Sequence, residues 1–433
     1  MALTPAWTEL RPHALQSKLW RTTARFPVVV AGRGSGKTEL SRRRLVRYLP
    51  IRKPWPDPLY GIGLPTYKQA KRVAWPQIEA LIPKQWLAPR GANKSDLTFT
   101  TIFGSTLMIV GMDKPFRIEG SQFDGFVLDE MSDQKPEAFT RTILPMLTHR
   151  NGWCWRVGKP KRTGIGAVEF KKAYDIGLKP NDAGIESYNW RSDTVLTQDQ
   201  LSAIAQQLGS EEYDEELNAE WLDATGGIFY AYSDREDGTG NVRDDFDYMS
   251  DRIIGVGSDF NVDPMAWVLF HVFDGCMWVF DEIWLRNTNT QRTLDELFRR
   301  YGTHQRGWKF FGDASSQNRH TSTSTTDYLQ ILNDKRFINK QVFYPKSNPS
   351  VADRFAATNA KLCNKLGVRK CFIHSRCTHL RDDLQQRTYK EGTREVADEG
   401  DIGHITDALG YPIHKMFPVH IELDNTGKVG IHG

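Results

Sequence analysis

The stretch AGRGSGKTEL, residues 31–40, decides the fold of the first half of the chain. It follows residues 26–30, FPVVV, an apolar and β-branched run that is typical of a buried parallel strand. Residues 39–49 after it are rich in helix formers. A strand, a glycine-rich turn ending in Lys-Thr and a helix together predict a phosphate-binding loop, because backbone N–H groups and the helix N-terminus converge on an anion.

The residues of this loop have separate expected roles. Lys37 would reach the β- and γ-phosphates of a nucleotide, and the hydroxyl of Thr38 would ligate Mg²⁺. Ala31 stands where such loops usually begin with glycine. The alternative is a glycine-rich turn without a ligand, which the fitting strand and helix disfavour. The nucleotide-binding residues expected from the loop are Arg33, Gly34, Ser35, Gly36, Lys37 and Thr38.

A second apolar run, residues 126–128, ends in the paired carboxylates of Asp129 and Glu130. Ligands bind at the carboxyl edge of a parallel sheet, so we expect both side chains beside the loop. Asp129 would hold Mg²⁺, and Glu130 would polarise the attacking water. In the alternative interpretation the pair only caps the helix expected from Glu137 onward. The presence of a phosphate-binding loop disfavours that alternative.

Further residues could contact the nucleotide. Gln16 lies in a helical stretch, HALQSKLW, and could read the adenine edge, although a surface glutamine is the simpler interpretation. Arg117 precedes the acidic pair in FRIEGSQFDG. An arginine that reaches the γ-phosphate stabilises charge in the transition state and can raise the rate by about 10³ or more. Arg33 is the other candidate for this role, and the sequence does not choose between the two.

The segments after this pair predict the rest of the first domain. Residues 153–157, WCWRV, read as another buried strand. Helical periodicity in residues 196–222 predicts a small helical lid. Basic clusters could hold a DNA backbone or could be ordinary solvated surface. They occupy residues 41–53, 159–162 and 170–172.

The pattern changes in the second half of the chain. Residues 253–260, 265–273 and 276–284 are three short apolar runs, and the last two are joined by Asp274-Gly275, a strong hairpin signal. Alternating helical and strand patterns follow. Three antiparallel strands and then alternating helices and strands are the order of an RNase H-like fold.

This order places three carboxylates at informative positions. Asp259 ends the first strand, Asp313 ends the fourth, and Asp407 projects from the last helix. In such a fold these positions converge on a site for two divalent cations about 4 Å apart, which would cleave a phosphodiester. Each aspartate alone is more simply a turn or cap residue. Asp263 and Asp401 lie nearby in the sequence and could take the place of one of these three. We favour each of them less as a direct metal ligand.

A cluster of cysteines and histidines lies between the second and third of these carboxylates. Its spacing, Cys371-x₂-His374-x₂-Cys377-x-His379, is too crowded for the usual two pairs of zinc ligands. A buried strand with Cys371 directed inward is the better explanation. We therefore expect no structural zinc.

The composition limits the class of protein. With 433 residues and 39% hydrophobic residues, the chain has enough apolar surface for two or three domains. No apolar run is long enough for a membrane span, and residues 1–13 have no pattern of a secretory signal. Five scattered cysteines suit reduced thiols in a cytoplasm. The net charge of +4 is weak evidence for a polyanionic partner.

Taken together, these motifs resemble the large terminase subunit of tailed bacteriophages. The resemblance rests on AGRGSGKT, an arginine before FVLDE, SDFNVDP, FGDAS and ITDALGY, in that order. It implies Walker A positions at Lys37 and Thr38, and Walker B and catalytic positions at Asp129 and Glu130. Arg117 matches an arginine finger that acts on a neighbouring subunit in some members. By the same comparison, Gln16 reads adenine, and the nuclease triad is Asp259, Asp313 and Asp407.

The resemblance also implies an architecture. It places a P-loop ATPase motor domain of the ASCE type, an α/β fold, at residues 1–224, with its lid at about 169–224. Residues 225–252 form a linker and domain entry, and residues 253–433 an RNase H-like nuclease domain. The family often has a small hydroxyl residue in the coupling motif, where this chain has Gly158-Lys159-Pro160.

The implied function is DNA packaging. ATP hydrolysis would drive double-stranded DNA into a procapsid, and a two-metal endonuclease would cut concatemeric DNA at the start and end of packaging. The cofactors would be ATP with Mg²⁺ at the motor site and two Mg²⁺ or Mn²⁺ ions at the nuclease site. The partners would be double-stranded DNA, a small terminase subunit and a portal protein. The subunits would form a ring, commonly a pentamer, or be monomeric in solution. The place of action would be the host cytoplasm, transiently on the procapsid rather than in the mature virion, with no membrane involved.

Two other classes of protein remain as alternatives. One is a nucleotide-gated DNA-binding scaffold whose second domain is catalytically silent. The other is a helicase-like repair ATPase, a class that usually has a second RecA-like domain. The antiparallel start of the second half disfavours the repair ATPase, and the three carboxylates disfavour a silent domain.

Overall fold

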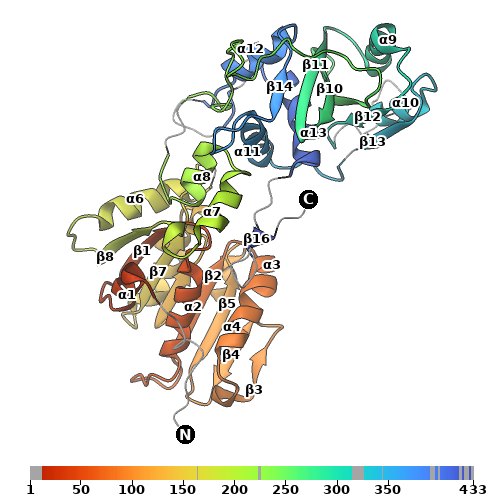
Figure 1. The fold of residues 1–433 in the computed structure, drawn as a ribbon. Coiled ribbons are helices and arrows are strands. Elements are labelled where there is room, and N and C mark those ends of the chain that lie inside the picture. Colours follow the sequence, from red (N-terminus) through yellow and green to blue (C-terminus); the bar gives the residue numbers. More distant parts are fainter. Residues whose placement is uncertain are drawn as a thin grey trace. The chain divides into compact units, whose positions relative to one another are not determined.

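The computed structural model describes residues 12–162, 164–222, 226–314, 326–343, 345–390, 395–397, 400–418, 422–423 and 429–430 (Figure 1). The chain divides into two compact units. Unit 1 contains residues 1–198 and 214–223, and unit 2 contains residues 199–213 and 224–433. The predicted boundary between lid and linker, at residues 224 and 225, lies outside the described residues.

In its described part, unit 1 is built on a sheet with the strand order β3-β4-β5-β2-β6-β7-β1-β8. The strands are β1 (Phe26–Ala31), β2 (Leu59–Leu64), β3 (Leu87–Asn93), β4 (Thr98–Thr101), β5 (Thr106–Gly111), β6 (Gly125–Leu128), β7 (Trp153–Gly158) and β8 (Ile185–Trp190). The strands from β5 to β8 in this order are parallel, and β3 and β4 pair antiparallel at one edge. The predicted α/β fold with a parallel sheet is thus confirmed.

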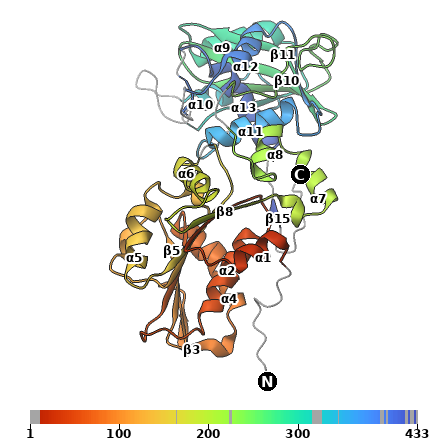
Figure 2. The same ribbon diagram turned by 90° about the vertical axis from the view of Figure 1, so that its left-hand side faces the viewer.

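Helices cover both faces of this sheet. Figure 2 shows α1, α2 and α4 on one face and α5 and α6 on the other. The helices of this unit are α1 (Ala14–Trp20), α2 (Lys37–Tyr48), α3 (Tyr67–Gln69), α4 (Trp75–Leu81), α5 (Leu144–Thr148) and α6 (Ala167–Gly177). Successive residues of β1 therefore enter two different cores, with Val29 in one and Val28 and Val30 in the other. This two-sided burial explains the uninterrupted apolar run of β1.

The predicted lid region differs from a purely helical segment. It contains the expected helices, α7 (Gln198–Ala205) and α8 (Ser210–Glu216), most of whose residues belong to unit 2. It also includes β8, which pairs in parallel with β1 from Phe26 to Ala31. The sequence of β8, IESYNW, lacks a regular apolar alternation, because only Tyr188 and Trp190 are buried in this edge strand. The periodicity therefore gave no strand signal there.

The described part of unit 2 contains a mixed sheet with the order β13-β12-β9-β10-β11-β14. Its strands are β9 (Ile254–Asp259), β10 (Met265–Phe273), β11 (Cys276–Leu285), β12 (Trp308–Phe311), β13 (Lys340–Phe343) and β14 (Cys371–Ile373). As predicted, β9, β10 and β11 are antiparallel. Asp274 and Gly275 turn the β10–β11 hairpin with φ of 52° and 71°, the left-handed values that such two-residue turns require.

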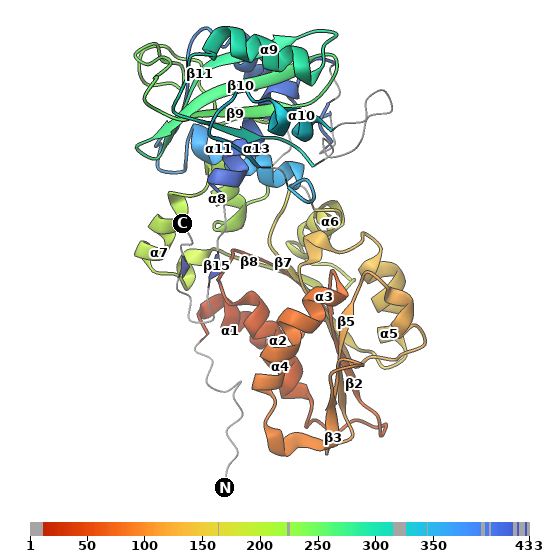
Figure 3. The ribbon, with the colours of Figure 1, turned by 90° about the vertical axis from the view of Figure 1, so that its right-hand side faces the viewer.

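Helices also lie on both faces of the second sheet. Figure 3 shows α9 on one face and α11 and α13 on the other. The helices are α9 (Thr290–Tyr301), α10 (Asp327–Asn333), α11 (Val351–Leu362), α12 (Thr378–Gln386) and α13 (His404–Met416), and a two-stranded pair, β15 (Glu422–Leu423) and β16 (Val429–Gly430), follows. Trp267 and Leu269 face the core beneath α9, whereas Ala266 and Val268 face the core beneath α13. None of the helices in the described residues is long and apolar enough to cross a bilayer.

Candidate functional site

The loop after β1 has the backbone of a phosphate-binding turn. Gly34 and Gly36 have φ of 71° and 78°, which glycine adopts at little cost, and α2 begins directly after them at Lys37. Ala31 is still part of β1 and pairs with Trp190. No turn is needed at that position, which explains why alanine can replace the usual glycine.

The loop and the acidic pair meet, as predicted. The hydroxyl of Thr38 donates to Asp129 Oδ1 at 3.2 Å, and Lys37 Nζ lies 3.3 Å from the carbonyl oxygen of Gly32. The strand order places β7 between β1 and β6, so the loop and the two carboxylates follow strands of the same parallel sheet. A hydroxyl and a buried carboxylate are hard oxygen donors, which is the chemistry that Mg²⁺ prefers. The residues at this site fit a magnesium nucleotide.

The two carboxylates of the pair are held differently. Burial, together with the neighbouring charge of Glu130, raises the pKa of Asp129. Burial also acts to raise the pKa of Glu130, but Lys37, Lys159 and Lys161 outweigh it and lower that pKa. Glu130 has φ of 52° and ψ of 50°, a left-handed conformation that is uncommon for residues with a side chain and often occurs at functional sites. Glu130 therefore stays ionised and held in a strained turn.

An ion-pair network links the loop to the end of α8 and to the segment after β7. Arg33 Nε lies 2.9 Å from Glu216 Oε2, and the Arg33 backbone N–H donates to the Glu216 carbonyl at 2.6 Å. Lys159 Nζ forms an ion pair with the other carboxylate oxygen of Glu216. Burial acts to raise the pKa of Glu216, but Lys159 and Arg33 lower it overall. Arg33 is thus bound to a carboxylate beside the phosphate-binding loop.

Gln16 also reaches the loop, through a contact that the sequence did not indicate. The side chain is 3% exposed, and its Nε2 donates to the carbonyl oxygen of Ser35 at 3.1 Å. Trp190 Nε1 donates to the same carbonyl at 3.1 Å. The structure thus places Gln16 against the loop rather than on the surface.

Arg117 is set apart from these residues. It lies on a 3₁₀ turn, Pro115–Ile118, and its exposed guanidinium is 5.9 Å from the ring of Tyr67. Within the described part of the chain it forms no hydrogen bond or ion pair with the phosphate-binding loop.

The predicted basic clusters are not entirely on the surface, since Arg42, Arg44 and Lys159 are buried.

The three predicted carboxylates of unit 2 lie on three elements of one region. Asp259 ends β9 and its Oδ2 lies 2.8 Å from His404 Nδ1, at the start of α13. Asp313 follows β12, which pairs with β9, and its carbonyl accepts a hydrogen bond from Tyr328. Burial raises the pKa of Asp259, and the charges of Asp407 and Asp313 contribute in the same direction.

The Asp407 carboxylate binds two arginines. Arg387 Nη1 donates to Asp407 Oδ1 at 2.7 Å, and Arg354 Nη1 lies 3.0 Å from the same oxygen. Three carboxylates are a suitable donor set for Mg²⁺ or Mn²⁺. Within the described residues, however, no group of three or more Asp, Glu, His or Cys side chains is gathered closely enough to hold a metal ion. The three side chains are thus of a type that suits these ions, but they are not gathered around one, and Asp407 is bound to the two arginines.

Asp263 and Asp401 share a different partner. Arg286 Nη1 lies 3.4 Å from Asp263 Oδ1, and Arg286 also forms an ion pair with Asp401. Both aspartates are part of this exposed ion-pair group.

Comparisons with known proteins agree with this arrangement. Residues 28–153 match the family model described as the N-terminal part of the T4-like type of terminase large subunit. Large terminase subunits of Thermus phage G20c and Thermus virus P23-45 are each 25% identical over 304 residues, which is 61% of this chain. The match spans 60% of the length of each of these relatives. The chain is thus similar to phage large terminase subunits, in sequence over 61% of its length.

Solved structures of large terminases share the fold over most of the chain. The large terminase of a thermophilic bacteriophage is 14% identical, with a TM-score of 0.64 over 94% of this chain and 99% of that protein. A second structure of the same phage enzyme, described as a complex with ADP, gives a TM-score of 0.62 at 15% identity. At these identities the likeness shows that the terminase fold is shared.

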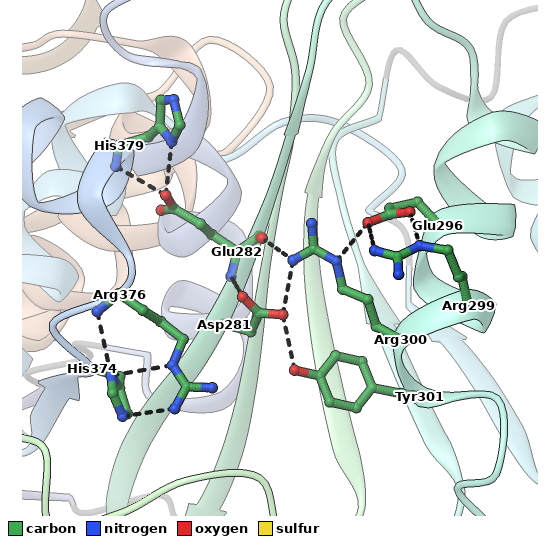
Figure 4. Close-up of polar contacts among 9 residues, drawn as sticks. All are labelled: Asp281, Glu282, Glu296, Arg299, Arg300, Tyr301, His374, Arg376 and His379. Carbon is green, nitrogen blue, oxygen red and sulfur yellow. Dashed lines mark hydrogen bonds and ion pairs between the residues drawn. The ribbon is translucent and has the colours of Figure 1, made fainter.

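The members of the cysteine and histidine cluster have separate partners. Cys371 and Cys377 are fully buried, and burial raises the pKa of both thiols. His374 contacts Arg376, and His379 Nδ1 lies 2.8 Å from Glu282 Oε1 (Figure 4). Glu282 also accepts the backbone N–H groups of His379 and Leu380 at 2.9 and 3.0 Å, so it caps α12.

Several contact residues of both sites were not expected from the sequence. Glu216 lay in a helical pattern without a motif, Arg354 lies in α11, and Arg387 directly follows α12. His404 stands three residues before Asp407, and this spacing places both in the first turn of α13. The spacing could have indicated His404 as a site residue.

Proposed function

We propose that this chain is a phage large terminase subunit, an ATP-driven DNA-packaging motor with an attached metal-dependent endonuclease. ATP hydrolysis moves double-stranded DNA into a procapsid, and the second unit cuts concatemeric DNA when packaging starts and ends. The contact between Thr38 and Asp129 is the observation that carries the motor assignment, because it joins a phosphate-binding loop to a buried carboxylate at a sheet edge. The large terminase of the thermophilic bacteriophage, which shares the fold, is described in complexes with ADP and with ATP-γ-S.

In this motor site each residue has a defined task. Thr38 and Asp129 hold Mg²⁺, which neutralises phosphate charge when bound. Lys37 binds the β- and γ-phosphates. Glu130, kept ionised by its lysine neighbours, orients the attacking water. The order of strands, with β7 between β1 and β6, supports an ASCE-type domain in which this water lies between loop and carboxylate.

The motor assignment is tested by replacing the proposed base. Glu130→Gln should lower the ATP turnover by about 10² or more, while binding of an ATP analogue is retained. Glu137→Gln is the matched control, because Glu137 is exposed on the same segment and should leave turnover unchanged. Normal turnover by Glu130→Gln would exclude this residue as the base.

Arg117 is proposed as a finger that completes the site of a neighbouring subunit. Its exposed position, away from the loop of its own chain, supports a role in trans. In mixtures of wild type and Arg117→Ala, the ATPase rate should fall non-linearly with the mutant fraction. An ATPase rate that falls in proportion to the mutant fraction would show that the finger acts within its own chain, and Arg33 would then be the candidate for this role.

Unit 2 is proposed to be an RNase H-like, two-metal nuclease. Its antiparallel β9–β10–β11 followed by parallel β12, and the placement of Asp259, Asp313 and Asp407, support this. Two Mg²⁺ or Mn²⁺ ions would activate water and stabilise the leaving oxygen when bound. Asp259→Ala should abolish plasmid cleavage, and Asp263→Asn should retain it. Intact plasmid with wild type under all metal conditions would contradict the assignment.

The partners follow from the proposed packaging role. They are a small terminase subunit, a portal protein and further copies of the chain in a ring, commonly a pentamer, that forms on the procapsid from monomers. The chain would act in the host cytoplasm and be absent from the mature virion. A nucleotide-gated scaffold or a helicase-like repair ATPase is the alternative, and retention of DNA translocation with no nuclease activity in any metal would favour it.

A further inference from the structure

The inner side of Asp407 is occupied by two guanidinium groups. Both approach the same carboxylate oxygen, Oδ1, at 2.7 Å from Arg387 and 3.0 Å from Arg354. Arg354 is 5% exposed and Arg387 is 7% exposed. Two interior cations therefore neutralise a carboxylate that the proposed nuclease reaction requires as a metal ligand.

Arg354 is held at this carboxylate by packing. It belongs to α11, and its guanidinium lies 4.5 Å from the ring centre of Tyr411, one turn after Asp407 on α13. Within the described residues its Nε and Nη1 are buried without a hydrogen-bond partner, so Nη1 meets Asp407 as an ion pair only. Buried donors are almost always paired, so the two unpaired nitrogens of Arg354 need an explanation other than a hydrogen-bond network.

The Arg387 side chain is hydrogen-bonded to the start of α13. Arg387 directly follows α12, and its Nη1 donates to the carbonyl of Gly403 and the hydroxyl of Thr406 as well as to Asp407. Gly403 has φ of 111°, and a Cβ there would lie 3.0 Å from the Arg387 guanidinium carbon. The approach of the cation to Asp407 therefore depends on a glycine at the first position outside the helix.

Charge explains what the two arginines do. Asp259, Asp313 and Asp407 gather negative charge in one region, because Asp259 ends β9, Asp313 follows β12, which pairs with β9, and Asp407 lies on α13, which packs on β9. Uncompensated buried charge is costly, and the two guanidiniums remove most of it without any metal. A divalent cation approaching the same carboxylates meets a blocked Oδ1 and two positive charges.

We propose that Arg354 and Arg387 are counter-ions of the resting nuclease centre, and that a divalent cation must displace them from Asp407. This inference rests on the proposed nuclease function. The arginines thereby weaken metal binding at this centre. Their role is to position and occupy Asp407, not to contact the reacting phosphate.

The test is the affinity of the full-length, nucleotide-free chain for Mn²⁺, measured by the electron paramagnetic resonance signal of free Mn²⁺. Binding that is lost in Asp259→Asn defines the nuclease centre. Arg354→Gln, which removes the charge, should tighten this binding by about fivefold or more. Arg354→Lys, which keeps the charge, should have an affinity for Mn²⁺ closer to that of the wild type than to that of Arg354→Gln.

The outcomes separate the inference from the function on which it rests. Unchanged or weaker Mn²⁺ binding by Arg354→Gln would overturn the counter-ion role, while the metal centre stands. Absence of Asp259-dependent binding in every variant would overturn the nuclease assignment and the inference with it. If Arg354→Gln fails to fold, as judged by its melting curve, Arg387→Gln tests the same claim and should also bind more tightly.

Discussion

Arg33 in the phosphate-binding loop and Glu216 at the end of α8 form an ion pair of 2.9 Å. Lys159 binds the same carboxylate, so one partly buried glutamate compensates two cations next to the loop. We expect a nucleotide, which brings its own negative charge to the loop, to compete with Glu216 for Arg33. The pair would then link nucleotide binding to the position of Glu216.

Glu216→Gln should destabilise the nucleotide-free protein. Two cations lose their carboxylate, and we expect a loss of about 1–3 kcal/mol and a melting temperature several degrees lower. ATP-γ-S should raise the melting temperature more in this variant than in the wild type, because phosphate oxygens replace the missing charge. Glu220→Gln, an exposed site in the same segment, is the control and should melt like the wild type. Equal nucleotide-induced shifts in all three proteins would contradict this account.

His271 should make the stability of unit 2 depend on pH. Its Nε2 accepts from the Met249 backbone N–H, and its Nδ1 lies 2.9 Å from the Ile253 carbonyl oxygen. Burial lowers its pKa from 6.5 to about 4. The unfolded chain takes up a proton below pH 6.5 and the folded chain does not, so stability is complete above pH 6.5 and falls as the pH drops to about 4. The effect amounts to up to about 3 kcal/mol.

Denaturant unfolding of wild type and His271→Gln between pH 7.5 and 4.5 measures this effect. The wild type should be the more stable protein at pH 7.5, and its advantage should shrink towards pH 4.5. His149→Gln, at an exposed position of unit 1, should show no change with pH relative to the wild type. A constant difference between wild type and His271→Gln would show that His271 is not the cause.

Glu282 should matter more for stability than Glu296, although both belong to the polar cluster in Figure 4. Glu282→Gln keeps only one oxygen for the two backbone N–H groups of His379 and Leu380, and should cost about 1–3 kcal/mol. Glu296→Gln loses contacts at 2.7 Å to Arg299 and Arg300 on the surface of α9, and should cost less than about 1 kcal/mol. Chemical denaturation of both variants gives the comparison, and the reverse order would refute it.

Gly257 in β9 should be required for the position of Asp407. A Cβ at Gly257 would lie 2.1 Å from the carbonyl oxygen of Ala408, so Gly257→Ala must displace α13. We expect a loss of about 1–3 kcal/mol in unit 2 and at least tenfold slower DNA cleavage, with ATP turnover retained. Ser258→Ala is the neighbouring control and should cleave normally, because the buried hydroxyl of Ser258 has no hydrogen-bond partner among the residues that the structure describes. Normal cleavage by Gly257→Ala would show that α13 adapts.

The sequence predicted those parts of the fold that depend on local patterns. The loop at Lys37, the carboxylates at Asp129 and the three strands from Ile254 to Leu285 follow from glycine spacing and apolar runs. Strand β8 was missed because an edge strand with few buried residues has no clear periodicity. Its pairing with β1 is set by tertiary contacts alone.

For the sites, the sequence indicated the carboxylates but not their counter-ions. Glu216 and Arg354 lie on helices and Arg387 directly follows one, at a distance in sequence from the residues that they contact. Charged residues are common enough in such segments that none of the three is distinctive. The basic run from residue 41 looked like a surface patch, yet Arg42 and Arg44 are buried against the sheet. Only the three-dimensional arrangement shows which cation meets which anion.

The burial of the cysteines has a practical consequence for labelling. Unit 1 contains a single cysteine, Cys154, which is fully buried in β7, and Cys371 and Cys377 in unit 2 are buried as well. Cys276 and Cys363 are partly exposed, and both belong to unit 2. A maleimide dye added to the native, unmodified protein should therefore mark the second unit alone. A fluorescent reporter of that unit's motion needs no engineered cysteine.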